Sequence, residues 1–214
     1  MCGRFSLPFM VQEVVEEFDI DQVLREFNPN YNIAPMQDIA VILAGSRILD
    51  VYKWGLLPHW AKDQKITYKL INARAETVAE KPAYRKALET RCLIPAGGFF
   101  EWKKDGKNKI PYYITLKKRK IFALGGITSI WTSDGKTIKT CSIVTTGPNK
   151  FMKDIHDRMP LIIPKDKEDL WLKGSIEDVK KLMVQSKEEM QSVIISTLVN
   201  SPKNNSPELL KPVY

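Results

Sequence analysis

Four short segments carry polar residues where the surrounding pattern predicts a buried core or a tight turn. The segments are MCGRF at 1–5, LINARAET at 70–77, RCLIPAGGFFEW at 91–102 and IHDRMP at 155–160. Cysteine is scarce, with three in 214 residues, and one occupies position 2, in a part of the chain that is usually poorly ordered. A thiol beside a base is a nucleophile, so Cys2 and His156 form a candidate pair for cysteine-type hydrolysis.

The other polar residues in these segments have a structural as well as a chemical interpretation. Asn72 and Arg74 would share one face of an extended segment, yet an asparagine also favours turns and an arginine pairs readily with a nearby glutamate. Glu101 interrupts an aromatic run, and on a strand it can be an ordinary outward-facing residue. His156 is one of two histidines and suits either structure or proton transfer. Taken singly, none of these residues identifies an active site.

The motifs exclude several common kinds of site. Two histidines and three dispersed cysteines give no metal-ligand spacing. The glycine patterns of nucleotide-binding loops and of serine hydrolases are also absent. We therefore expect neither a metal nor a cofactor. The glycine pairs at 97–98 and 125–126 predict bulges or tight turns.

The elements that must position these residues are mainly strands. Helical spacing predicts helices over 8–18, 81–90, 166–172 and 175–187. Strands are expected at 39–45, 48–54, 92–95, 98–104, 111–117, 121–131, 137–146, 160–164 and 192–199, followed by an extended tail from about residue 200. Because the strands and helices do not alternate regularly, we expect an α+β fold. It should be one domain over 1–214, with a mainly antiparallel sheet, curled or barrel-like, and peripheral helices.

Composition restricts the partners and the compartment. The formal net charge is +8, from 33 basic and 25 acidic residues, which suits a polyanionic partner such as nucleic acid without requiring one. No apolar run approaches the length that spans a bilayer, and glutamates at 13, 16 and 17 interrupt the region where a signal peptide would be apolar. We therefore expect no membrane association and a reduced, cytoplasmic location, associated with the nucleoid if the source is bacterial.

Taken together, the segments resemble the SOS response-associated peptidase (SRAP) family, whose members sense abasic sites in single-stranded DNA. The resemblance rests on MCGRF, YNIAP at 31–35, WGLLPHW at 54–60, INARAET at 71–77, RCLIPAGGFFEW and HDRMP, and it ends near Pro164. The family pattern around the glutamate reads closer to PADGFYEW. Gly97 and Phe100 therefore stand here in place of an acid and a tyrosine, a difference that predicts a looser strand around Glu101.

The resemblance implies a set of site residues and a partner. Cys2, once freed of Met1, corresponds to the residue that bonds covalently to the abasic sugar, with Asn72, Glu101 and His156 around that bond. The implied DNA contacts are Arg4, Arg74 and Arg158 for phosphate or positioning, and Pro35, Trp60 and Trp102 for wedging or stacking against bases. The implied partner is single-stranded DNA that contains abasic sites, bound by a monomer.

This implied chemistry needs a cysteine at the chain terminus. The α-amine adds to the ring-opened aldehyde to give an imine, and the thiol of the same residue then closes a five-membered thiazolidine ring. An α-amine has a pKa of about 7.7–8.0, so roughly a tenth of it is neutral at pH 7, and ring closure gains from proximity. Glu101 is the candidate for proton transfer, His156 for donation to the sugar oxygen, and Asn72 for holding the amine or sugar.

Two alternatives remain open at this stage. A cysteine-type peptidase or autoprotease would use Cys2 as nucleophile and His156 as base, and it would not need a free α-amine. A noncovalent single-stranded DNA-binding module would bind in a salt-sensitive way and would keep its affinity after loss of Cys2.

Overall fold

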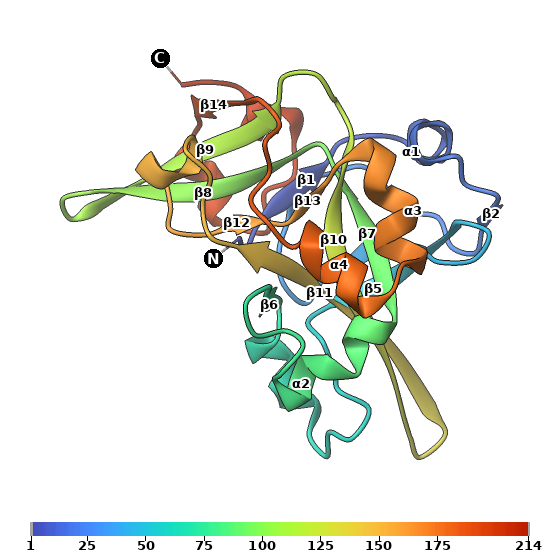
Figure 1. Cartoon of the computed structure of the whole chain (residues 1–214). Coiled ribbons are helices and arrows are strands. Elements are labelled where there is room, and N and C mark those ends of the chain that lie inside the picture. The colour runs from blue at the N-terminus through green and yellow to red at the C-terminus, as the bar shows by residue number, and fades with distance from the viewer. Residues whose placement is uncertain (1, 214) are drawn as a thin grey trace.

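Five strands close into a barrel in the computed structural model, which describes residues 2–213 (Figure 1). They are β4 (Asp38–Leu43), β5 (Ile48–Trp54), β7 (Arg91–Ala96), β10 (Phe122–Ser133) and β11 (Lys136–Thr146). Neighbours pair antiparallel in the order β11-β10-β7-β4-β5, and a parallel pairing of β5 with β11 closes the ring. Closure removes free strand edges. The expected α+β fold with a mainly antiparallel, barrel-like sheet is confirmed.

A second sheet of five antiparallel strands lies beside the barrel. Its order is β14 (Met190–Ile194), β9 (Asn108–Leu116), β8 (Gly98–Asp105), β1 (Phe5–Leu7) and β3 (Asn30–Ile33). The chain passes from the barrel to this sheet at Gly97, between β7 and β8. A side chain at this position would begin 2.8 Å from the side chains of Pro8 and Phe9, so glycine permits this close approach.

Short strands extend one end of β11 and bring distant segments together. They are β6 (Asn72–Arg74) and β12 (Met159–Pro160), while β2 (Gln22–Val23) and β13 (Ile162–Ile163) pair with β5 and β10. β6 runs parallel to residues 143–145 of β11, and β12 runs antiparallel to residues 145–146. The segments that hold Asn72 and His156 therefore converge at the end of β11.

The helices are short and peripheral. They are α1 (Val11–Phe18), α2 (Pro82–Arg85), α3 (Glu168–Lys173) and α4 (Ile176–Leu182). Short 3-10 helices are η1 (Gln64–Lys69), η2 (Ala87–Glu89), η3 (Met152–Asp154), η4 (Lys165–Lys167), η5 (Thr197–Asn200) and η6 (Pro207–Leu210). The indole of Trp171 on α3 donates a 2.8 Å hydrogen bond to the Cys92 carbonyl of β7, which fixes the helix against the barrel.

Several predicted boundaries are wrong for identifiable reasons. The first helix begins at Val11 rather than residue 8, because 8 and 9 pack against Gly97. The helix expected over 175–187 ends at Leu182, and the strand expected over 192–199 ends at Ile194. A hydroxyl at Ser196 then accepts the Leu198 N–H and starts a 3-10 turn.

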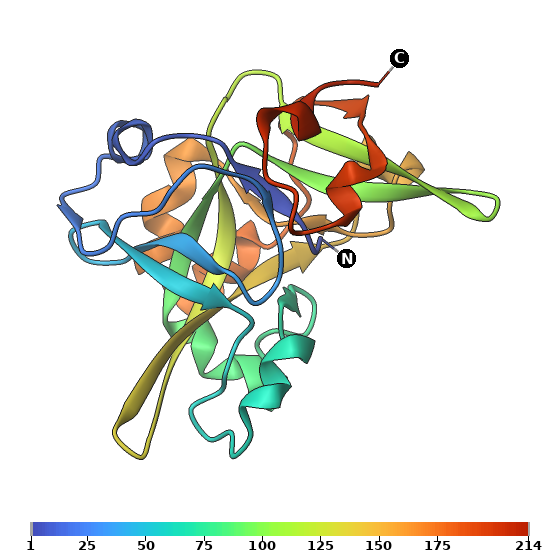
Figure 2. The ribbon, with the colours of Figure 1, turned by 180° about the vertical axis from the view of Figure 1, so that it is seen from behind.

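The sequence predicts an extended tail from about residue 200, but the tail is not extended throughout. Residues 207–210 form the turn η6, whose Leu209 is buried. Burial of one leucine and a proline at the start of the turn outweigh the polar composition of this segment. The tail lies across the five-stranded sheet (red in Figure 2), where its Leu210 packs against the buried cluster of Phe100, Tyr113, Ile195 and Val199.

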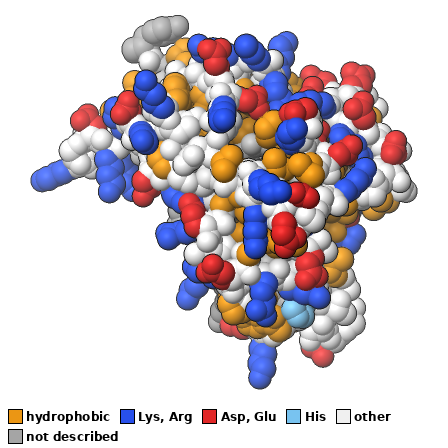
Figure 3. All heavy atoms as spheres, viewed as in Figure 1, with side chains coloured by type: hydrophobic (Ala, Val, Ile, Leu, Met, Phe, Trp, Pro, Cys, Tyr) orange, Lys and Arg blue, Asp and Glu red, His pale blue; other side chains and the backbone are white. Residues whose placement is uncertain are grey.

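Many basic side chains lie at the surface, whereas the cysteines lie in the interior. Basic side chains are spread over the face shown in Figure 3, among fewer acidic ones. All three cysteines are free and buried. Within residues 2–213, no helix is long and apolar enough to span a membrane, and no group of three His, Cys, Asp or Glu side chains could hold a metal ion.

Candidate functional site

Cys2 lies just before β1 and is completely buried. The Asn72 Nδ2 group donates a 2.8 Å hydrogen bond to the Cys2 carbonyl. Tyr84 in turn donates from its hydroxyl to the Asn72 carbonyl, at 2.9 Å, which fixes β6. Asn72 itself is 9% exposed, and its Oδ1 atom has no hydrogen-bond partner among residues 2–213. A buried acceptor without a donor is costly, so this oxygen is suited to receive an N–H from a ligand or from a processed terminus.

Glu101 is brought beside the terminal segment by strand pairing. Antiparallel pairing of β1 with β8 places Phe5 opposite Phe99, and the Phe100 N–H donates to the Arg4 carbonyl at 2.9 Å. Glu101 follows directly on β8 and is 2% exposed. Burial raises the pKa of Glu101 to about 7. Near neutral pH this carboxyl therefore divides between its acid and base forms, which suits proton transfer.

The thiol of Cys2 has the opposite character to an activated nucleophile. Burial raises its pKa well above the usual value, and the charge of Glu101 adds to this effect. The Sγ atom lies 4.0 Å from the carbonyl oxygen of Arg4. At neutral pH the sulfur therefore remains a thiol.

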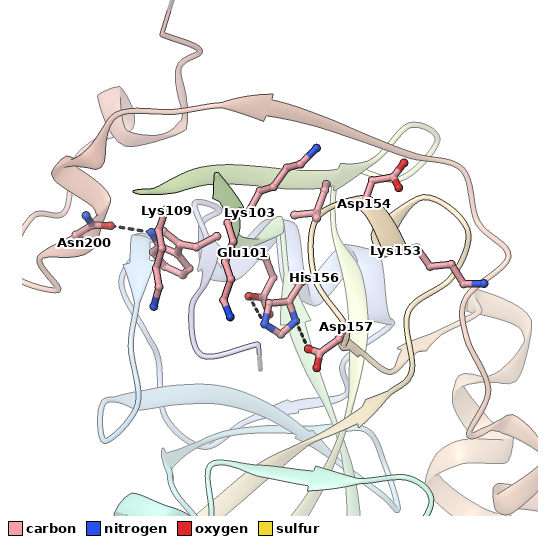
Figure 4. Close-up of a pocket in the computed structure, with 11 residues that line it drawn as sticks. Glu101, Lys103, Lys109, Lys153, Asp154, His156, Asp157 and Asn200 are labelled. Carbon is pink, nitrogen blue, oxygen red and sulfur yellow. Dashed lines mark hydrogen bonds and ion pairs between the residues drawn. The ribbon is translucent and has the colours of Figure 1, made fainter. Parts of the chain in front are cut away.

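His156 completes the group from the opposite side (Figure 4). Its Nε2 atom lies 3.7 Å from Glu101 Oε2, an ion-pair distance rather than a hydrogen-bond distance. On the other edge of the ring, Nδ1 accepts a 3.0 Å hydrogen bond from the Arg158 N–H and lies 3.0 Å from Asp157 Oδ1. Burial lowers the pKa of His156. The ring is thus held from its Nδ1 edge, with Nε2 directed at Glu101.

The four residues proposed for chemistry therefore lie together, although they are up to 154 positions apart in sequence. Asn72 holds Cys2, Cys2 is close enough to Glu101 to be affected by its charge, and Glu101 lies beside His156. Glu101 and His156 line a cleft of about 860 Å³. Its remaining lining residues are Trp102, Lys103, Lys104, Lys109, Lys153, Asp154, Ile155, Asp157 and Asn200.

Arg4 is already engaged by the protein. Its Nη1 atom donates to Asn32 Oδ1 at 2.7 Å and to the Val199 carbonyl at 2.6 Å. Its guanidinium lies 5.9 Å from the centroid of the Trp102 ring. Burial lowers the pKa of Arg4. These contacts tie the first strand to the C-terminal segment.

Arg158 is engaged as well. Its two terminal nitrogens bind the Glu76 carboxylate at 2.6 and 3.0 Å, and Nη2 also donates to the Thr145 carbonyl at 2.6 Å. The pair lowers the pKa of Glu76. Arg74, on β6, is exposed. Of the three arginines suggested for phosphate, Arg74 is therefore the one with an exposed side chain.

The three residues suggested for stacking lie in different places. Trp102 lines the cleft, and its Nε1 atom donates to Asn200 Oδ1 at 2.8 Å. Pro35 is half-buried between β3 and β4. Trp60 is 50% exposed and lines a separate hollow of about 240 Å³, together with Ile130.

The lysines of the cleft are not among the site residues predicted from the sequence. Lys103, Lys104 and Lys109 stand on the hairpin formed by β8 and β9, and they belong to the run KKDGKNK that follows Glu101 almost directly. The sequence predicts a strand through Lys104 here and assigns these lysines no role. The proximity of the run to Glu101 was the available signal.

The sequence matches a known protein family over most of its length. The model of the SOS response associated peptidase (SRAP) family matches residues 1–202. The chain belongs to the SRAP family. The match continues well past Pro164, where the sequence resemblance was expected to end, so the SRAP region includes α3, α4 and β14.

Two relatives and one solved structure resemble almost the whole chain. The chain is 49% identical over 221 residues to the abasic site processing protein YoaM of Bacillus subtilis (strain 168), covering 98% of this chain and 97% of that protein. It is 48% identical over 222 residues to YoqW of Bacillus phage SPbeta, covering 99% of each. A crystal structure of a Bacteroides thetaiotaomicron protein superimposes with a TM-score of 0.92 at 28% identity, covering 100% of both chains.

Proposed function

We propose that this chain senses abasic sites in single-stranded DNA and links covalently to them through Cys2, once Met1 has been removed. The main support for this proposal is that Asn72 holds Cys2 beside the Glu101–His156 pair. This pair lines a cleft that also contains lysines. The relatives named as abasic site processing proteins support the substrate class.

The groups of the protein and of the open sugar account for each bond and proton in the proposed reaction. The Cys2 α-amine adds to the C1′ aldehyde of the open sugar, and loss of water gives an imine. The thiol then adds to the imine carbon while its proton passes to the nitrogen, closing a thiazolidine. Glu101, with a pKa of about 7, takes a proton from the terminal ammonium and returns it to the leaving hydroxyl. In this proposal His156 donates a proton to the sugar oxygen.

The buried amide of Asn72 supports an order in which the amine reacts first. Its Nδ2 atom holds the Cys2 carbonyl, and its Oδ1 atom is a buried acceptor suited to an amine N–H. Because the thiol pKa is raised, the sulfur enters after the imine has formed. A cysteine peptidase instead requires a thiolate activated by histidine, and His156 directs Nε2 at Glu101. The geometry therefore gives this alternative less support.

A denaturing gel tests the proposal. Met1-processed protein is incubated with a single-stranded oligonucleotide that bears one abasic site, and we expect a heat-stable covalent product. The product should be lost in Cys2→Ala and blocked by acetylation of the α-amine. Cys141→Ala, which removes a buried barrel thiol, is the matched control and should still react. Absence of any adduct from the processed wild-type protein would contradict the proposal.

The same assay separates the alternatives. Cys2→Ser should give an imine that borohydride traps, but no stable ring. A peptidase would retain peptide cleavage after acetylation of the α-amine. A noncovalent binding module would bind DNA equally well in Cys2→Ala and form no adduct in any variant.

A further inference from the structure

Three lysines on one hairpin line the same cleft as Glu101 and His156. Lys103 and Lys104 come from β8 and Lys109 from β9. Lys104 lies directly opposite Lys109 in the strand ladder. Like charges in that position destabilise a hairpin. Among the described residues, no carboxylate forms an ion pair with any of the three.

The two sides of the cleft differ in charge. The hairpin contributes the three lysines, whereas the segment that carries His156 contributes Lys153 together with Asp154 and Asp157. Figure 4 shows Lys109 on one side of the Glu101–His156 pair and Lys153 on the other. The projecting end of the hairpin, at the left of Figure 3, carries a gathering of basic side chains. An extended polyanion is therefore favoured along the hairpin side.

Two of the other cations near the site, Arg4 and Arg158, are less available for phosphate. Arg4 is bound to Asn32 and Val199, and Arg158 to Glu76 and Thr145. A strand that places an abasic sugar beside Glu101 still needs its flanking phosphates neutralised. The hairpin lysines meet that requirement without breaking an existing ion pair.

We propose that Lys103, Lys104 and Lys109 form a phosphate track for the DNA backbone on one side of the abasic site. The track leads the strand past Trp102, which lines the cleft and whose ring is fixed by its bond to Asn200. An aromatic ring in this position can stack on a base of any sequence. The inference rests on the proposed function for the identity of the strand, while its cationic lining is independent of the covalent chemistry.

Salt-dependent binding tests the track. The triple variant Lys103→Gln, Lys104→Gln, Lys109→Gln is compared with a control that replaces Lys117, Lys118 and Lys120 by glutamine at the opposite end of β9. Fluorescence anisotropy with an undamaged single-stranded oligonucleotide gives affinity over a salt series. We expect the track variant to lose about 2 from the slope of log affinity against log salt, and roughly tenfold or more in affinity at low salt. The control should stay near wild type.

The outcomes separate this inference from the proposed function. A track variant that binds like wild type, or a control that loses as much, overturns the track even if covalent adducts form. A wild-type protein that forms no adduct overturns the proposed function, while a selective loss in the track variant still supports the phosphate track. Melting temperatures check that the variants fold. Because the track variant lacks the Lys104–Lys109 repulsion, its melting temperature should equal or exceed that of wild type.

A directional substrate pair makes the test sharper. One oligonucleotide has its abasic site near the 5′ end and the other near the 3′ end, so each offers a long flank on one side. At subsaturating DNA, the track variant should lose adduct yield with one of the two and retain it with the other. Equal losses with both would contradict a track that follows one flank.

Discussion

At the scale of single residues, the proposed chemistry depends on the burial of Glu101. The same carboxyl on an exposed strand would remain ionised at neutral pH and would be a poor acid. At 2% exposure, with a pKa of about 7, it can both accept and donate a proton under physiological conditions. The neighbouring His156 has the opposite shift for the same reason, because burial disfavours the charged form of either group.

The raised pKa of Glu101 predicts a particular pH dependence of stability. The folded protein holds this proton more tightly than the unfolded chain, whose pKa is near 4.5. The stabilisation is therefore fully present below about pH 4.5 and is lost as the pH rises through about 7. We expect the free energy of unfolding of wild type to fall by roughly 3 kcal/mol relative to Glu101→Gln between these limits. Urea denaturation across this range measures it, and parallel curves for both proteins would refute it.

At the scale of elements, one asparagine holds the C-terminal segment against the start of the chain. The buried Asn32 on β3 donates from Nδ2 to the carbonyls of Ser201 and Asn204, at 3.0 and 2.9 Å. Its Oδ1 atom accepts from Arg4, two positions from Cys2. The segment also supplies Asn200, which fixes Trp102 in the cleft. Closure of this segment and the shape of the site are therefore linked through one side chain.

Replacement of Asn32 should loosen that segment selectively. We expect Asn32→Ala to lower the free energy of unfolding by about 2 kcal/mol, because it leaves several buried groups without partners. Amide exchange should accelerate over 199–204 more than in the barrel strands β7 and β10. Asn205→Ala is the matched control, since its Oδ1 atom accepts one exposed bond from Tyr31. Uniform acceleration of amide exchange across the whole chain would argue against a local role of Asn32 in holding the C-terminal segment.

At the scale of the whole molecule, one chain supplies all four residues proposed for the chemistry. Cys2, Asn72, Glu101 and His156 come from four segments that meet where β6 and β12 flank the end of β11 and β1 pairs with β8. No group in this constellation requires a second copy. The barrel provides the rigid base, and the five-stranded sheet provides the wall of the cleft.

We therefore expect the protein to act as a monomer. Light scattering of the free protein should give a mass near 24.5 kDa, and the adduct should contain one chain per abasic site. The reason is that each catalytic candidate has its positioning partner within the same chain. A stable mass of twice this value at micromolar concentration would contradict the expectation.

The sequence alone determined the features that depend on short-range order. Alternating apolar residues located the barrel strands, turn residues located the hairpins, and the spacing of motifs identified the family resemblance before any contact was known. A cysteine at position 2 also determined that removal of one residue would create a terminal aminothiol. Element ends were less predictable, because the segment after α4 is held by Asn149, which donates to the Ser186 carbonyl, and the turn η6 buries Leu209.

Tertiary structure decided which of the singled-out residues meet and in what electrostatic state. Pairing of β6 and β12 with β11 brought Asn72 and His156 together, and desolvation between two sheets raised the pKa of Glu101. The fold also engaged Arg4 and Arg158 in protein contacts and placed three lysines along the cleft. Local sequence does not determine these outcomes, because burial and charge pairing arise only when segments far apart in the chain exclude water from one another.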